Sequence, residues 1–157
     1  MKLTVVLITI FTYPVFANST CKPGDTTFCN VQYLRNYDGD TITFNIPNVH
    51  PLLGKEIAIR VNGIDTPEKR TKDRCEKDLA IQAQKLIETT LKKAKQIDLI
   101  NTSRGKYFRI VADVIVDGVS IKDLLIKNNL AYTYDGGTKS KIDWCNVKQL
   151  RKPAGNQ

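Results

Sequence analysis

The chain has 157 residues and a formal net charge of +8 at pH 7. This length suits one compact domain with a buried core. The surplus of positive charge favours a polyanionic partner, nucleic acid before an anionic membrane surface. Beyond the N-terminal region no segment approaches the length of a membrane span, which argues against an integral membrane protein and favours a soluble product.

The N-terminus is typical of a secretory signal peptide. Lys2 supplies a positive charge, Leu3–Phe11 is an apolar run too short to cross a bilayer, and Ala17 offers a small residue at a cleavage site. We expect residues 1–17 to be the signal peptide and residues 18–157 to be a single exported domain, periplasmic or secreted. We also expect a monomer that does not insert into a membrane. An apolar first strand of the domain is the alternative interpretation.

Four cysteines, Cys21, Cys29, Cys75 and Cys145, lie in the expected mature part. An even number of cysteines in an exported chain favours two disulfides. Three pairings are open, and we favour Cys21–Cys29, whose members are neighbours in the sequence, together with Cys75–Cys145. A structural zinc site is disfavoured, because there is no Cys-x-x-Cys pair and His50 is the only histidine.

The first half of the expected domain shows the alternation of apolar and polar residues that is typical of half-buried strands. It predicts three strands, at residues 31–35, 42–46 and 57–61. Asp-Gly-Asp at residues 38–40 predicts a turn between the first two strands. Residues 47–54, with two prolines and a glycine, predict a loop.

The second half begins with a helical period, because apolar residues recur at steps of three and four over residues 79–94. Residues 97–99 predict a short strand and residues 110–116 another. Ser120, with an acid three residues later, predicts the cap of a helix from residue 121 to about residue 128.

The predicted order is three strands, a helix, two strands and a helix. Trp144 and Cys145 are expected to anchor the polar C-terminal stretch that begins at Asp135. Five short strands with interspersed helices favour an α+β fold built on a small closed barrel, with the OB-fold as the leading candidate. An open α+β sheet is also compatible with this pattern.

Three polar clusters carry most of the chemical information. They are Asp-Gly-Asp-Thr at residues 38–41, Arg-Val-Asn-Gly-Ile-Asp-Thr-Pro-Glu at residues 60–68, and Lys-Tyr-Phe-Arg at residues 106–109. Each has a structural interpretation when taken alone: a common turn, a cap before a loop or helix, and a basic strand edge. The first cluster does not open an EF-hand loop, because Ile42 occupies the next ligand position.

Phosphodiester hydrolysis needs residues of the types that these clusters contain. A hard cation with oxygen ligands neutralises charge on the phosphoryl oxygens, and Asp40 and Asp65 could bind it at the ends of two predicted strands. Glu68 could hold the attacking water. Arg60 and Arg109 could clamp the phosphate oxygens through paired hydrogen bonds.

Taken together and in this order, the clusters resemble the motifs of the staphylococcal nuclease family, from about residue 31 to residue 134. The resemblance implies a five-stranded OB-fold barrel with two to three helices. It also implies calcium-dependent hydrolysis of DNA and RNA with little sequence preference, leaving 3′-phosphate ends. The cysteines and the shorter segment at residues 69–77 make the chain similar to exported relatives from Gram-negative bacteria and their plasmids.

The resemblance also implies roles for residues in the first two clusters. Asp40 and Asp65 would bind calcium with the help of the backbone carbonyl of Thr66. Asp38 would lie near the metal without binding it directly. Glu68 would position or activate the attacking water.

The resemblance also implies which residues bind the substrate. Arg60 and Arg109 would hold the scissile phosphate, and four further residues would contact the rest of the nucleotide. Lys106 and Tyr107 would contact a terminal phosphate of the nucleotide. The base and sugar pocket would be lined by Tyr132 and Tyr134, for which core aromatics of a final strand are the alternative.

Two other functions compete with this hypothesis. One is a catalytically inactive nucleic-acid-binding OB module of the cell envelope. The other is an exported structural or interaction protein stapled by disulfides. The acids at positions 40, 65 and 68 disfavour the first, because a binder of polyanions gains nothing from acids in its groove. Metal-dependent hydrolysis separates both from a nuclease.

Overall fold

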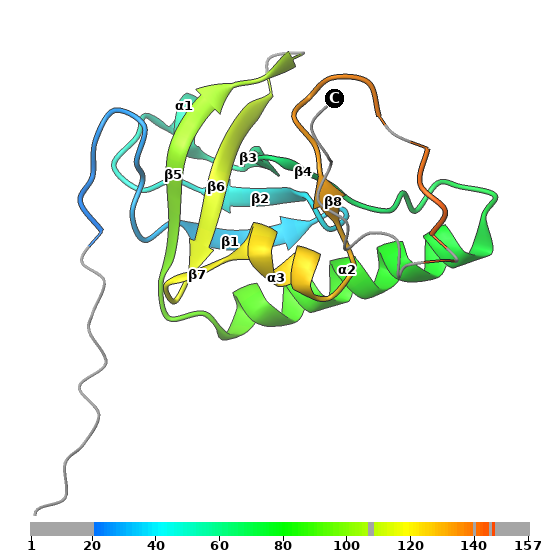
Figure 1. The fold of residues 1–157 in the computed structure, drawn as a ribbon. Coiled ribbons are helices and arrows are strands. Elements are labelled where there is room, and N and C mark those ends of the chain that lie inside the picture. Colours follow the sequence, from blue (N-terminus) through cyan, green and yellow to red (C-terminus); the bar gives the residue numbers. More distant parts are fainter. Residues whose placement is uncertain (1–20, 107–108, 140, 145, 147–157) are drawn as a thin grey trace, which may run out of the picture.

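The computed structural model describes residues 21–106, 109–139, 141–144 and 146, so the expected signal peptide, Tyr107 and Cys145 lie outside the described residues. Five strands of one mixed sheet form the centre of the fold (Figure 1). In the order in which they pair, they are β1 (Gln32–Asn36), β2 (Thr41–Asn45), β3 (Ile57–Val61), β6 (Ile110–Val116) and β5 (Ile97–Arg104). The five strands predicted from the alternation are therefore confirmed, although β5 is longer than expected.

Neighbouring strands of this sheet are antiparallel except for the parallel pair β3 and β6. The segment just before β1 turns to the opposite edge of the sheet. Val31 N donates to Ile97 O at 2.9 Å, and Phe28 and Leu99 exchange two backbone hydrogen bonds of 2.8 Å. These bonds join the two edges of the sheet through the lead-in to β1, in keeping with an α+β OB-fold, without a ladder between β1 and β5 themselves.

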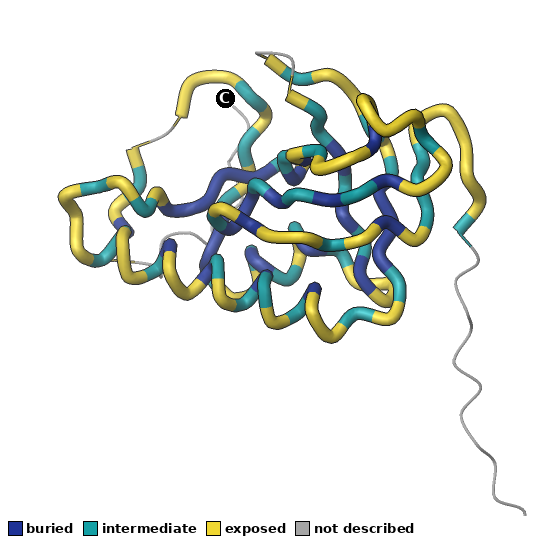
Figure 2. The backbone as a smooth tube through the Cα atoms, turned by 180° about the vertical axis from the view of Figure 1, so that it is seen from behind, coloured by how far each residue is buried: buried dark blue, intermediate teal, exposed yellow. Residues whose placement is uncertain are grey.

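Helix α2 (Arg74–Lys93) is the predicted amphipathic helix, and it lies across one side of the sheet (Figure 1). Asp73 precedes the helix, and its side chain caps the first turn by accepting a hydrogen bond from Glu76 N at 3.1 Å. Its buried face carries small and aliphatic residues, namely Ala80, Ala83, Ile87 and Leu91. In Figure 2 the other face of this helix is largely exposed, as its charged residues require.

Helix α3 (Ile121–Lys127) follows the two-residue strand β7 (Val119–Ser120), which pairs with β6. The Ser120 hydroxyl accepts from Asp123 N at 3.3 Å, so the predicted helix cap is confirmed. The loop prediction for residues 47–54 was incomplete, because α1 (Pro51–Gly54) forms a single turn there. Pro51 suits the first helical position, since proline lacks the N–H that has no partner in a first turn.

The core lies between α2, α3 and the sheet. Its largest fully buried side chains come from alternate positions of the central strands, among them Ile42, Phe44, Ile59 and Val114. This arrangement explains why period-two alternation identified the strands. Among the described residues no helix has both the length and the apolar character needed to cross a membrane.

The N-terminal part of the described chain is closed by a disulfide between Cys21 and Cys29, whose Cα atoms are 5.8 Å apart. This pairing confirms the first half of the predicted disulfide pattern. Cys75 is also disulfide-bonded. Its predicted partner, Cys145, lies outside the described residues, so that pairing stays a prediction.

Candidate active site

The turn between β1 and β2 carries the first polar cluster. One oxygen of Asp38 accepts from the backbone N–H groups of Asp40, at 3.2 Å, and Thr41, at 2.8 Å, so the side chain fixes the turn around it. Gly39 is required for space rather than for an unusual backbone angle. A Cβ atom there would lie 2.9 Å from Ala83 Cβ and 3.0 Å from Thr66 Cγ2. The turn therefore packs directly against α2 and the second cluster.

Asn36, at the end of β1, anchors this turn and was not identified from the sequence. It is buried, and its amide nitrogen donates to Asp38 O at 2.9 Å and to Gln84 O in α2 at 3.0 Å. Gln84 donates back to Asn36 O at 3.3 Å, and Tyr33 donates to the Asn36 side-chain oxygen at 2.6 Å. A polar residue at a strand end just before an acidic turn was the only hint in the sequence.

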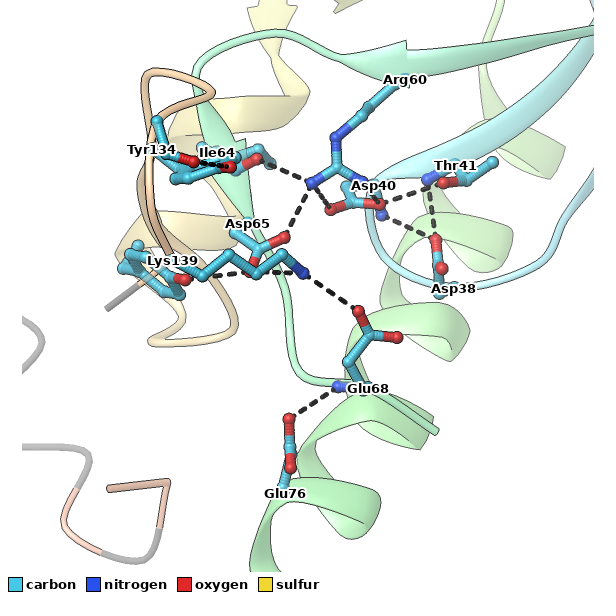
Figure 3. A network of polar contacts seen from close by, with 12 residues as sticks. Asp38, Asp40, Thr41, Arg60, Ile64, Asp65, Glu68, Glu76, Tyr134 and Lys139 are labelled. Atoms are coloured by element: carbon cyan, nitrogen blue, oxygen red, sulfur yellow. Dashed lines mark hydrogen bonds and ion pairs between the residues drawn. The ribbon is translucent and has the colours of Figure 1, made fainter. Parts of the chain in front are cut away.

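Arg60 brings the first two clusters together. It lies opposite Thr41 in the β2–β3 ladder, which places its side chain next to Asp40. Its terminal nitrogens lie 3.0 and 2.9 Å from the two carboxylate oxygens of Asp40, and Nη2 also lies 2.7 Å from Asp65 Oδ1 (Figure 3). Two buried carboxylates, one from the β1–β2 turn and one from the second cluster, thus converge on one guanidinium group.

Burial sets the charge balance at this point. It raises the pKa of Asp40 from 3.8 to about 7; Arg60 lowers this pKa, and the neighbouring carboxylates of Asp38 and Asp65 raise it further. For Arg60, burial lowers the pKa, but the two adjacent acids outweigh that effect and raise it overall. Arg60 therefore offsets part of the cost of burying Asp40 as a charged carboxylate.

Asp65 belongs to β4 (Ile64–Asp65), a two-residue strand that the sequence analysis did not predict. It pairs with β8 (Tyr132–Thr133), so that Asp65 faces Tyr132. The Tyr132 hydroxyl donates to Asp65 Oδ2 at 2.9 Å, and its ring lies 6.0 Å from that of the buried Trp144. Burial and this hydrogen bond raise the pKa of Tyr132, so the phenol stays protonated and donating.

Glu68 lies beyond Asp65, where the chain leaves β4 for α2. Its backbone N–H donates to Glu76 at 3.1 Å, which ties this end of the cluster to the first turn of α2. Its own carboxylate is exposed and lies 3.2 Å from Lys139 Nζ, while the same nitrogen lies 3.1 Å from Asp65 Oδ2 (Figure 3). Burial lowers the pKa of Lys139, but its hydrogen bonds and charge interactions with the two acids raise it overall.

A pocket of about 780 Å³ opens beside these residues. Among the described residues, five cationic side chains line it against two acidic ones, Glu68 and Asp135; the cations are Arg60, Arg104, Lys106, Arg109 and Lys139. Arg60 is the link between the two parts of the site, because it lines the pocket and contacts the buried carboxylates.

The two described residues of the third cluster, Lys106 and Arg109, lie between β5 and β6 rather than in a strand. Gly105 N donates to Arg109 O at 2.8 Å and closes this hairpin. Lys106 Nζ donates to Gly136 O at 2.7 Å, and Tyr134 lines the pocket as well. Tyr107 lies outside the described residues, so its predicted role is untested.

The structure thus gathers most of the predicted site residues from the three clusters and from β8. Asp40, Arg60, Asp65 and Glu68 form one contact network, and Arg109 borders the same pocket. Two pocket cations, Arg104 and Lys139, were missed, because neither belongs to a cluster.

The donor set of Asp40 and Asp65 fits a hard divalent cation. Both side chains are buried, and both already hold a positive group, Nη2 of Arg60, between them. Thr66 is buried next to them. A separate group, formed by Cys21, Cys29 and Asp98, has metal-like spacing, but its two sulfur atoms form the disulfide and carry no thiolate.

The sequence profile of the staphylococcal nuclease homologue family matches residues 58–154, which include the second and third clusters. The chain belongs to the staphylococcal nuclease family. The resemblance seen in the motifs is therefore confirmed at the level of the family. Its further assignment to exported relatives from Gram-negative bacteria stays a prediction.

Two relatives from Bacillus subtilis (strain 168) are similar to this member of the family. Endonuclease YncB is 35% identical over 115 residues, which are 70% of this chain and 52% of YncB. The SPbeta prophage-derived endonuclease YokF is 34% identical over 112 residues, which are 67% of this chain and 35% of YokF. The chain therefore spans about half of one relative and about a third of the other.

Proposed function

We propose that this family member is a calcium-dependent phosphodiesterase that hydrolyses DNA and RNA with little sequence preference. One observation carries the proposal: two buried carboxylates, Asp40 and Asp65, converge on a cation at the wall of a pocket lined by arginine and lysine. The names of the two relatives, both endonucleases, support the same activity.

Asp40 and Asp65 are the residues that would hold the metal, with the backbone carbonyl of Thr66 as a further ligand. Calcium prefers oxygen ligands, and carboxylates and carbonyls are the groups that it commonly binds in proteins. When bound, the ion would neutralise negative charge on the phosphoryl oxygens. Asp38 acts indirectly in this proposal, since its oxygen fixes the turn that positions Asp40.

The cationic pocket would bind the phosphate backbone of the substrate. Arg60 and Arg109 present guanidinium groups that suit two oxygens of one phosphate. Lys106 at the hairpin and Tyr134 opposite it border the same space, where they would contact a neighbouring phosphate and a base or sugar. Contacts to the backbone carry no sequence information, which fits an enzyme with little sequence preference.

In this proposal Glu68 is the residue that would direct a water molecule. Its carboxylate is exposed, and Lys139 holds it next to Asp65. Hydrogen bonding to this carboxylate would orient a water for attack on phosphorus opposite the leaving 5′-oxygen. Attack in this direction leaves products that end in 3′-phosphate.

Export belongs to the same proposal. The disulfide between Cys21 and Cys29 would persist in the periplasm or outside the cell, where thiols are oxidised. The charged N-terminus and short apolar run support a signal peptide that ends at Ala17. We propose a monomeric exported enzyme.

The alternative, an inactive nucleic-acid-binding module, is separated from the enzyme by an Asp40→Asn variant. Binding of labelled single-stranded DNA is measured by fluorescence anisotropy, and cleavage of the same DNA is measured by gel electrophoresis in calcium. The proposal predicts that the variant binds about as well as the wild type but does not cut. Wild-type protein that binds DNA yet cuts none in calcium, magnesium or manganese would support the binding module.

A further inference from the structure

Lys139 contacts the acidic cluster although it belongs to none of the three motifs. Its ammonium nitrogen lies 3.1 Å from Asp65 Oδ2 and 3.2 Å from Glu68 Oε1. In Figure 3 the side chain extends from the segment after β8 toward these two acids, on the side of Asp65 away from Arg60. Asp65 therefore has a cation on each of its oxygens, Arg60 on one and Lys139 on the other.

The segment that carries Lys139 is held against the site by its own hydrogen bonds. Tyr134 N donates to Gly63 O at 3.0 Å, and the Tyr134 hydroxyl donates to Gly137 O at 2.7 Å. Lys106 from the opposite hairpin donates to Gly136 O at 2.7 Å. Lys139 thus reaches the acids from a segment that is anchored on both sides of the pocket.

An ion pair between a surface lysine and an acid usually contributes little to the stability of the fold, because solvent screens exposed charges. The pair between Lys139 and Glu68 is of that kind, since about half of each side chain is exposed. The pair with Asp65 differs, because only 6% of the Asp65 side chain is exposed. A cation interacts more strongly with a buried carboxylate than with an exposed one, because the effective dielectric constant is lower inside the protein.

We propose that Lys139 is an internal counter-cation that competes with a divalent metal ion for Asp65. In the absence of metal its ammonium group satisfies one oxygen of Asp65 and holds Glu68 beside it. A metal ion bound to Asp40 and Asp65 must displace this ammonium group or bind in its positive field, so Lys139 weakens metal binding. The inference rests on the proposed function of Asp40 and Asp65 as metal ligands.

The released ammonium group would remain in the pocket, which Lys139 lines together with Arg60 and Arg109. Lys139 is thus a positioning residue for the acids before metal binding and a further cation for the substrate after it. This exchange couples metal binding to the charge that the pocket presents to a phosphate.

The test is the affinity for Ca²⁺ of the full-length chain and its variants, measured by isothermal titration calorimetry without nucleic acid. Lys139→Met keeps the aliphatic stem and removes the charge. It is expected to bind Ca²⁺ about tenfold more tightly than the wild type, because a unit positive charge close to the ion is removed. Lys141→Met, two residues along at an exposed position, is the matched control and should leave the affinity unchanged.

A second variant, Lys139→Gln, keeps a hydrogen-bond donor without the charge and should shift the affinity in the same direction. Thermal unfolding in chelator confirms that each variant is folded. Equal or weaker Ca²⁺ binding by both Lys139 variants, with a wild type that does bind Ca²⁺, overturns the competition but leaves the proposed metal site intact. A wild type and variants that all fail to bind Ca²⁺ overturn the calcium site itself, and the competition with it.

Discussion

Replacing Arg60 with methionine is expected to destabilise the metal-free protein as well as to reduce its activity. The side chains of Asp40 and Asp65 are only 3% and 6% exposed, and both make ion pairs with Arg60, at 2.9 and 2.7 Å. Methionine fills much of the same volume but leaves both acids without this partner. The acids then remain charged at a cost or take up a proton.

The size of the effect follows from the burial of the acids. Breaking a buried ion pair by removing one partner typically costs about 3–5 kcal/mol. Because 20% of the Arg60 side chain is exposed, we expect the lower end, about 3 kcal/mol. This is a large part of the stability of a small domain, which is about 5–15 kcal/mol in total.

The assay is urea unfolding in chelator, followed by the fluorescence of Trp144, the only tryptophan, which is buried in the fold. Arg35→Met is the matched control, because Arg35 pairs with Glu56 through side chains that are 63% and 53% exposed. The control should lose less than about 1 kcal/mol. An Arg60→Met variant that unfolds at the same urea concentration as the control would refute the reasoning.

Four further predictions concern individual residues of the site. Gly39→Ala should lower the free energy of unfolding in urea by about 1–3 kcal/mol, because the added Cβ would lie 2.9 Å from Ala83 Cβ. Gly24→Ala is the control and should leave this free energy unchanged, because nothing lies within 4 Å of its added Cβ. Tyr132→Phe should lower the free energy of unfolding by about 1–3 kcal/mol in the same assay, because it removes the hydrogen bond that the Tyr132 hydroxyl donates to the buried Asp65 carboxylate. In chelator, Asp40 holds its proton longer in the folded than in the unfolded chain, so its contribution to stability is present below its ordinary pKa of 3.8 and is lost as pH rises through about 7. Urea midpoints measured across that range should fall less steeply in Asp40→Asn. Arg109→Ala should lower turnover about 10²–10³-fold in a nuclease assay with folding intact, and near-wild-type turnover would remove Arg109 from the catalytic residues.

Most of the architecture could be predicted because it follows from the burial of one face of each element. Alternation identified the strands whose inner residues, such as Ile42, Phe44 and Val114, are fully buried. The three-and-four spacing identified α2 for the same reason. The two-residue strands β4 and β8 could not be found in this way, since a period cannot be seen in two residues.

The site was predictable where a residue type and its neighbours in the sequence suggested chemistry. Asp40, Arg60, Asp65 and Glu68 lie in two short clusters, and the fold brings these together through the pairing of β2 with β3. Lys139 could not be predicted, because its contacts depend on the path of the chain after β8 and on no local pattern.

The ion pairs of Arg60 could not be predicted from the sequence either. Its assignment as a phosphate clamp described the residue type correctly, but its ion pairs with Asp40 and Asp65 depend on tertiary contacts. The structure adds that Arg60 stabilises the acids, so a loss of activity on its removal reports on two roles. Arg109, which lies at the hairpin on the pocket, is the cleaner position for testing phosphate binding.

The central claim is that Asp40 and Asp65 form a metal site for phosphodiester hydrolysis. It is tested most directly by the release of acid-soluble nucleotides from heat-denatured DNA, in millimolar calcium and again in chelator. The account predicts release by the wild type in calcium only, and none by a folded Asp65→Asn variant in either condition. Release that persists in chelator, or an Asp65→Asn variant as active as the wild type, would contradict it.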